Sequence, residues 1–123
     1  MRLPRPITAA MSALALLVPL SAAAAEAPGP KSHRLLLQID SDDQQTMNMV
    51  MGNALNAKKY YDDKGEPLQV EIVAYGPGIT MLRGDTSPVK DRIASLKSSI
   101  PGIVMSMCNN AKTAAEKREG HEI

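Results

Sequence analysis

Residues 68–78 read LQVEIVAYGPG, and this stretch decides the fold. Apolar and polar side chains alternate from Leu68 to Tyr75, with β-branched residues among them, which is typical of a β-strand. The sequence Gly76-Pro77-Gly78 then ends the strand sharply. Two other segments are predicted as strands, residues 34–40 (RLLLQID) and 103–107 (IVMSM). The three consecutive leucines of the first predict burial on both faces, as in a parallel sheet.

Helical patterns separate these strands and follow the last one. They cover about residues 42–61, 89–100 and 111–118. Ser41 with Gln44 fits a capping box for the first helix, and Ser87 is predicted to cap the second. Asn109 or Asn110 is expected to cap the third, which ends at Gly120. The order β-α-β-α-β-α predicts a three-layer α/β domain, with a mainly parallel sheet and helices on both faces.

The N-terminus has the three regions of a secretory signal peptide. Two arginines precede an apolar run over residues 7–20, and small residues follow up to an Ala-x-Ala cleavage site ending at Ala25. The run is too short for a membrane helix and contains Pro19. We therefore predict a cleavable signal peptide at 1–25, a linker at 26–33 and one domain at 34–123. The protein is then periplasmic or secreted, with no stable membrane anchor.

Charge and composition exclude some partners. The chain has 123 residues, and removal of Arg2 and Arg5 with the signal leaves 12 basic and 13 acidic residues, a net charge of −1. Such a balance does not favour nucleic acid as a partner, because phosphate backbones are bound by an excess of Lys and Arg. The chain has no Phe and no Trp, so its core must consist of Ile, Leu, Val, Met and Ala.

The single cysteine, Cys108, follows the third predicted strand. Three segments are expected at the carboxyl edge of the sheet, where parallel sheets bind ligands: Asp40-Ser41, Tyr75-Gly76-Pro77-Gly78 and Cys108-Asn109-Asn110. Cys108 also precedes a helix, whose positive end stabilises a thiolate. These residues, apart from Tyr75, are the candidate site. From position alone, Cys108 is a reactive thiol, a partner in an intermolecular bridge or a buried filler of the core.

Five segments resemble the DsrE/DsrF-like family of sulfur-relay proteins, in collinear order over about residues 34–118. They are LLLQIDSDD, MNMVMGNALN, VEIVAYGPGI, Ser87-Pro88-Val89 opening a helix, and Cys108-Asn109-Asn110 ending a strand. The resemblance implies a DsrE-like α/β fold and a sulfurtransferase-like persulfide carrier at Cys108. It also implies a sulfur donor or acceptor as partner, assembly into homo-oligomers and no organic cofactor.

The chain departs from that family in two ways. Family members usually continue with further strands and a closing helix, whereas this sequence stops at His121-Glu122-Ile123, so we expect the domain to be incomplete at its C-terminus. The well-known relays of this type are also cytoplasmic, whereas a signal peptide is predicted here.

Two alternatives remain. The first is a non-catalytic module that binds a small ligand or assembles into a homo-oligomer, with a structural cysteine. The second is Cu(I) binding by Cys108 and the methionines, which are soft ligands. The periodicity disfavours it, because Met47 and Met51 share a helix face while Met49 does not. His33 and His121 have no ligand-like neighbours, so we expect no metal site.

Overall fold

The computed structural model describes residues 29–123, and the signal peptide prediction lies outside them. Three parallel strands form one sheet in the order β1-β2-β3. They are β1 (His33–Ile39), β2 (Leu68–Ala74) and β3 (Val104–Met107). In the register, Leu36 pairs with Glu71, and Glu71 pairs with Val104. Strand β2 is therefore central, and its inward residues are buried.

Helices connect and follow the strands. They are α1 (Gln44–Asp62), the 3-10 helix η1 (Gly76–Leu82), α2 (Lys90–Ser99) and α3 (Asn109–Glu119). The predicted α/β class and the β-α-β-α-β-α order are confirmed. None of the helices within residues 29–123 has the length and apolar character needed to cross a bilayer.

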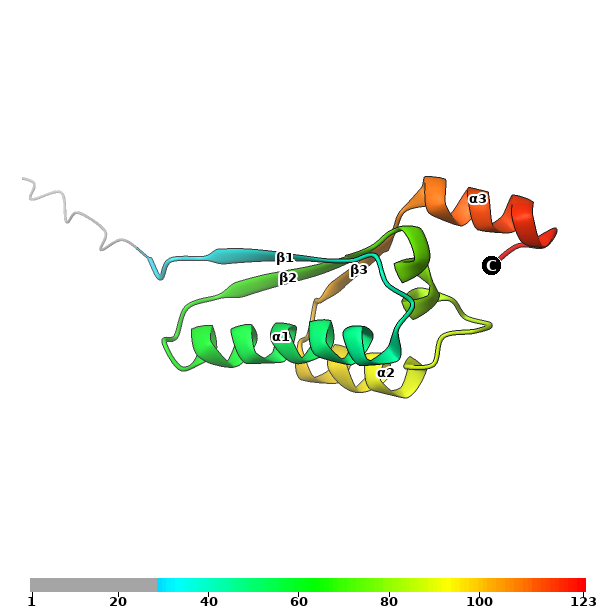
Figure 1. Cartoon of the computed structure of the whole chain (residues 1–123). Coiled ribbons are helices and arrows are strands. Elements are labelled where there is room, and N and C mark those ends of the chain that lie inside the picture. Colours follow the sequence, from blue (N-terminus) through cyan, green and yellow to red (C-terminus); the bar gives the residue numbers. More distant parts are fainter. Residues whose placement is uncertain (1–28) are drawn as a thin grey trace, which may run out of the picture.

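The arrangement of the helices differs from the expected covering of both faces. Helices α1 and α2 lie together under the same face of the sheet, and α3 extends beyond the carboxyl ends of the strands (Figure 1). The strand order explains this placement. Both crossovers step in the same direction across the sheet, and right-handed crossovers in one direction put their helices on one face. Covering the second face needs a reversal of strand order, which β1-β2-β3 does not contain.

The core lies between the sheet and these two helices. Helix α1 contributes Met47, Val50, Met51 and Ala54, and β2 contributes alternate residues from Leu68 to Ala74. Met47 and Met51 have no exposed surface, whereas Met49 is 59% exposed. The methionines of α1 therefore divide into core and surface as their helical spacing indicates, and two of them fill the core in place of aromatic side chains.

The leucines of β1 are not buried on both faces. Leu35 and Leu37 pack against the core, but Leu36 between them is 55% exposed. A run of apolar residues predicts burial on both faces only if both faces are covered. No helix within residues 29–123 covers the second face, so Leu36 projects away from α1 and α2.

Two helix starts also differ from the prediction. Asp43, rather than Ser41, is the N-cap of α1, and its carboxylate accepts hydrogen bonds from the Thr46 N–H (2.7 Å) and hydroxyl (2.8 Å). The N–H bond lowers the pKa of Asp43. Val89, rather than Ser87, is the N-cap residue of α2. The Ser87 hydroxyl donates to the Met81 carbonyl (2.6 Å) and accepts from the Val89 N–H (3.3 Å). Gly120 does end α3, in the left-handed conformation with φ +77°.

Candidate functional site

Cys108 joins the end of β3 to the start of α3. Its N–H donates to the Ala74 carbonyl on β2 (2.8 Å), and its own carbonyl accepts from the Lys112 N–H (2.9 Å). Cys108, rather than Asn109 or Asn110, is the N-cap residue of α3. It is a free, half-buried cysteine. The backbone of the thiol-bearing residue is thus fixed on both sides, by the sheet and by the helix.

No side chain of residues 29–123 caps the N-terminus of α3. The first N–H groups of a helix have no acceptor within the helix. At α3 they belong to Asn109, Asn110 and Ala111, next to the cysteine. These groups and the positive end of the helix dipole can stabilise a negatively charged group bound at this position.

Asp40, Tyr75 and Cys108 form one row across the carboxyl edge of the sheet. The last paired row is Ile39, Ala74 and Met107, and each of the three edge residues is the next in its strand. The Tyr75 N–H donates to the Ile39 carbonyl (3.0 Å), which continues the ladder into this row. The Tyr75 hydroxyl also donates to Asp40 Oδ2, at 3.5 Å.

Tyr75 is a member of this row that sequence reasoning left out of the candidate site. It is 38% exposed and carries a phenol, which can donate or accept a hydrogen bond. The sequence did place Tyr75 at this edge, at the end of the alternating strand, and this position next to Asp40 and Cys108 is the signal that could have added it to the site.

Gly76 and Gly78 have different roles although they belong to one turn. Gly76 has φ +50°, a conformation that glycine adopts without strain. Gly78 is buried, and a Cβ there would lie 2.2 Å from the Ile39 carbonyl oxygen. Gly78 therefore lets η1 pack on the end of β1. The backbone that comes close to Gly78 belongs to the protein itself, rather than to a ligand.

A pocket of about 440 Å³ lies between η1 and α3 at this end of the molecule. Its lining includes two of the predicted site residues and several others: Gly76, Pro77, Thr80, Ala111, Ala114 and Arg118. Cys108, Asn109 and Asn110 do not line it. Both asparagines are exposed in the first turn of α3. Ser41 is also not part of the pocket, and its hydroxyl accepts from the Asp43 N–H (3.1 Å).

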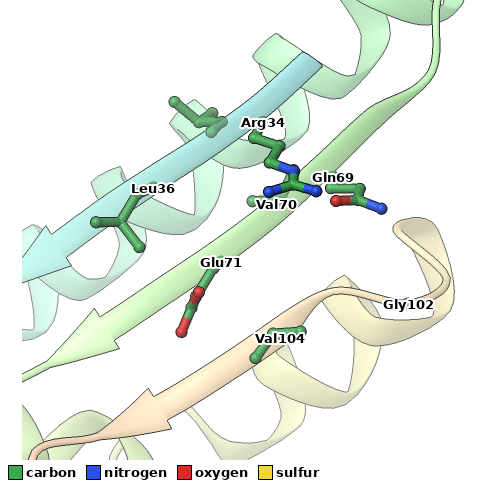
Figure 2. Close-up of a pocket in the computed structure, with 8 residues that line it drawn as sticks. Arg34, Leu36, Gln69, Val70, Glu71, Gly102 and Val104 are labelled. Carbon is green, nitrogen blue, oxygen red and sulfur yellow. The ribbon is translucent and has the colours of Figure 1, made fainter. Parts of the chain in front are cut away.

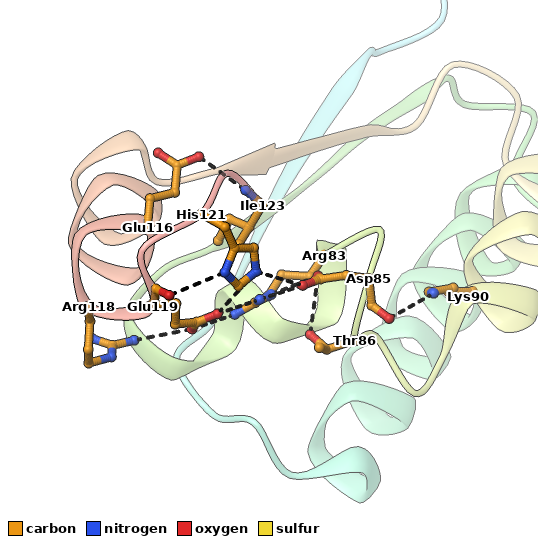
Figure 3. Close-up of polar contacts among 9 residues, drawn as sticks. All are labelled: Arg83, Asp85, Thr86, Lys90, Glu116, Arg118, Glu119, His121 and Ile123. Carbon is orange, nitrogen blue, oxygen red and sulfur yellow. Dashed lines mark hydrogen bonds and ion pairs between the residues drawn. The ribbon is translucent and has the colours of Figure 1, made fainter.

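Arg83 holds the far end of α3 against the segment that follows η1 (Figure 3). Its guanidinium, only 8% exposed, donates two bonds to Asp85 (2.9 and 2.6 Å) and two to Glu119 (2.8 Å each). These bonds place the pKa of Asp85 far below its ordinary value, lower that of Glu119 and raise that of Arg83. Helix α3 is therefore fixed at both ends, by Cys108 and by Glu119.

Sequence reasoning missed this arginine cluster. Arg83 and Glu119 are 36 residues apart, and neither belongs to a recognisable motif. No group of three or more His, Cys, Asp or Glu side chains within residues 29–123 could hold a metal ion. His33 instead stacks on Tyr61 and contacts Glu66 at 2.7 Å, which ties the start of β1 to the turn after α1.

Comparisons with known proteins support the fold assignment alone. No protein-family model matches the chain, and no curated protein matches it. Among solved structures, it is similar to a protein of unknown function, MTH1491 from Methanobacterium thermoautotrophicum. The identity is 24% and the TM-score 0.59, over 73% of this chain and 71% of the other. This similarity supports the α/β fold.

Proposed function

We propose that the protein is an exported sulfur carrier that acts through Cys108. The observation that carries the proposal is the position of Cys108, a free, half-buried cysteine at the N-cap of α3. The first N–H groups of α3 have no acceptor within the helix, and they lie next to this cysteine, where they can donate to a negatively charged group. The resemblance of the strand end Cys108-Asn109-Asn110 to the DsrE/DsrF-like pattern supports the same reading.

The proposed reaction is a thiol exchange. The Cys108 thiolate attacks the outer, sulfane sulfur of a donor persulfide, and the S–S bond of the donor breaks. The donor leaves as a thiolate, and Cys108 keeps the sulfur as a persulfide anion. An acceptor thiolate then attacks that terminal sulfur and releases the Cys108 thiolate. Two electrons move with each bond, so no external oxidant or reductant is needed.

The test is intact-protein mass spectrometry of reduced protein after incubation with a small-molecule persulfide donor. We expect a gain of one sulfur, about 32 mass units, that is reversed by dithiothreitol. Cys108→Ala should gain nothing, and its circular dichroism should match that of the native protein. A folded native protein that never gains sulfur would refute the proposal. Mass also tests export, since cleavage at the predicted site leaves Glu26 as the first residue of the secreted chain.

The second candidate is a non-catalytic module that binds a small ligand. The pocket between η1 and α3 favours it, because that pocket contains Arg118 and Thr80 but excludes Cys108. The two candidates make opposite predictions for one variant. Cys108→Ala abolishes sulfur uptake in a carrier, whereas a binding module retains its ligand affinity without the thiol.

A further inference from the structure

One face of the sheet is not covered by any helix of residues 29–123, and the proposed function does not use this open face. Leu36, Glu71 and Val104 form one row across all three strands on this face (Figure 2). Leu36 is 55% exposed and Val104 is 51% exposed. A pocket of about 520 Å³ lies on the face, lined by Arg34, Leu36, Gln69, Glu71 and Val104 among others. Exposed apolar side chains around a hollow, with polar groups among them, are typical of an interaction surface.

The charges of this face indicate what binds it. It carries one basic residue of the pocket lining, Arg34, and one acidic residue, Glu71. Glu71 lies one strand away from Arg34 and two residues further along, which separates their Cα atoms by roughly 8 Å. A face with one charge of each sign has no net charge to attract a strongly charged partner, but it is complementary to itself.

We propose that this face binds the same face of a second copy of the chain in a two-fold symmetric dimer. A two-fold axis in the interface, midway between Arg34 and Glu71 and perpendicular to the line that joins them, places each arginine opposite the partner's glutamate. Both ion pairs then form together, as symmetry requires of an isologous contact. Ser106 Oγ donates to Glu71 Oε1 (2.6 Å) and holds the carboxylate on this face, while Oε2 can still accept.

The size of the face predicts a weak dimer. Three strands of this length cover roughly 300 Å² in projection. Because side chains protrude from this area, the surface buried by two copies together approaches roughly 1,000 Å². This is the lower limit for specific interfaces. We therefore expect a dimer dissociation constant in the micromolar range. This dimer is independent of sulfur chemistry at Cys108.

The first test is analytical ultracentrifugation of the purified protein from roughly 1 μM to roughly 200 μM, a range chosen for a weak interface of this size. We expect a monomer–dimer equilibrium. Leu36→Asp should weaken it by about tenfold or more, because a carboxylate would be buried in the contact. Met49→Asp is the matched control, since Met49 is 59% exposed but lies on α1. A monomer at every concentration, or equal effects of the two variants, would overturn the proposal.

The second test uses charge reversal. Arg34→Glu and Glu71→Lys each place like charges opposite one another in a homodimer. The dissociation constant of each variant's homodimer should therefore rise by about tenfold or more. Mixing the two restores both attractive pairs in a heterodimer, and the mixture should associate again. Circular dichroism confirms that each variant is folded. If both variants are folded but remain monomeric when mixed, the proposed pairing is wrong. Binding of a different protein to this face, without self-association, would also overturn it.

Discussion

Replacing Gly78 with alanine should destabilise the protein, although most glycine-to-alanine changes are mild. The added Cβ would lie 2.2 Å from the Ile39 carbonyl oxygen and 2.6 Å from its carbon. Relief of that contact requires the backbone of η1 to move by about 1 Å, because an unstrained carbon–oxygen contact is well above 3 Å. The same carbonyl accepts the Tyr75 N–H at 3.0 Å, so the movement also weakens this hydrogen bond.

The magnitude follows from these two effects. Forcing extra atoms into a packed site costs about 1–3 kcal/mol, and loss of the hydrogen bond costs about 1 kcal/mol. Alanine restricts the unfolded chain, which offsets up to about 1 kcal/mol. The net expectation is a loss of about 1–4 kcal/mol in the free energy of unfolding.

Urea denaturation followed by circular dichroism measures this loss. Gly52→Ala is the matched control, because Gly52 lies inside α1 and its added Cβ would have no atom of residues 29–123 within 4 Å apart from the adjacent helix backbone. That change should stabilise the protein by about 0.5–1 kcal/mol, since glycine is a poor helix residue. The two variants are expected to have opposite signs. If Gly78→Ala matched the wild type at an unchanged m-value, the close approach of η1 to β1 would be refuted.

The remaining predictions concern the arginine cluster and the core. Glu119→Gln should lower the melting temperature at neutral pH and lose its effect in acid: the pKa of Glu119 is depressed by Arg83, so its contribution is present above the ordinary carboxyl value and disappears as the pH falls through the lower folded value. Melting curves of both proteins from neutral to strongly acidic pH measure this, and a difference that grows on acidification would contradict it. Met51→Ala should cost about 2–5 kcal/mol, because the side chain is fully buried. Met49→Ala should change stability by less than about 0.5 kcal/mol, and equal urea midpoints for these two variants would contradict the assignment of core and surface on α1.

The alternation in residues 68–75 was sufficient to predict the central strand, because one face of β2 is buried and the other is not. The same kind of reasoning failed for Leu35–Leu37. A run of apolar residues carries no period, so it could not reveal that Leu36 lies on an open face. Strand order decides which faces are covered, and strand order is a property of the whole chain.

The candidate site was predicted in part for a similar reason. Asp40 and Cys108 were expected at the carboxyl edge because each follows a predicted strand, and their row agrees with that expectation. The N-cap of α3 was predicted to be an asparagine, because capping preferences depend on side chains. The N-cap is instead Cys108, because the helix begins directly after the strand, at Asn109. Arg83 and Glu119 could not be paired in advance, because their contact depends on where α3 folds back.

The strands have the same order in the sheet as along the chain, and this order bears on how the domain folds. Each new strand is added to an edge that earlier residues have already formed, so the sheet can grow from its N-terminal side without waiting for distant segments. β1 and β2 share seven paired rows, whereas β2 and β3 share four. The β1-α1-β2 unit should therefore form first and open last, and the amides of β3 should exchange with solvent hydrogen before those of β2.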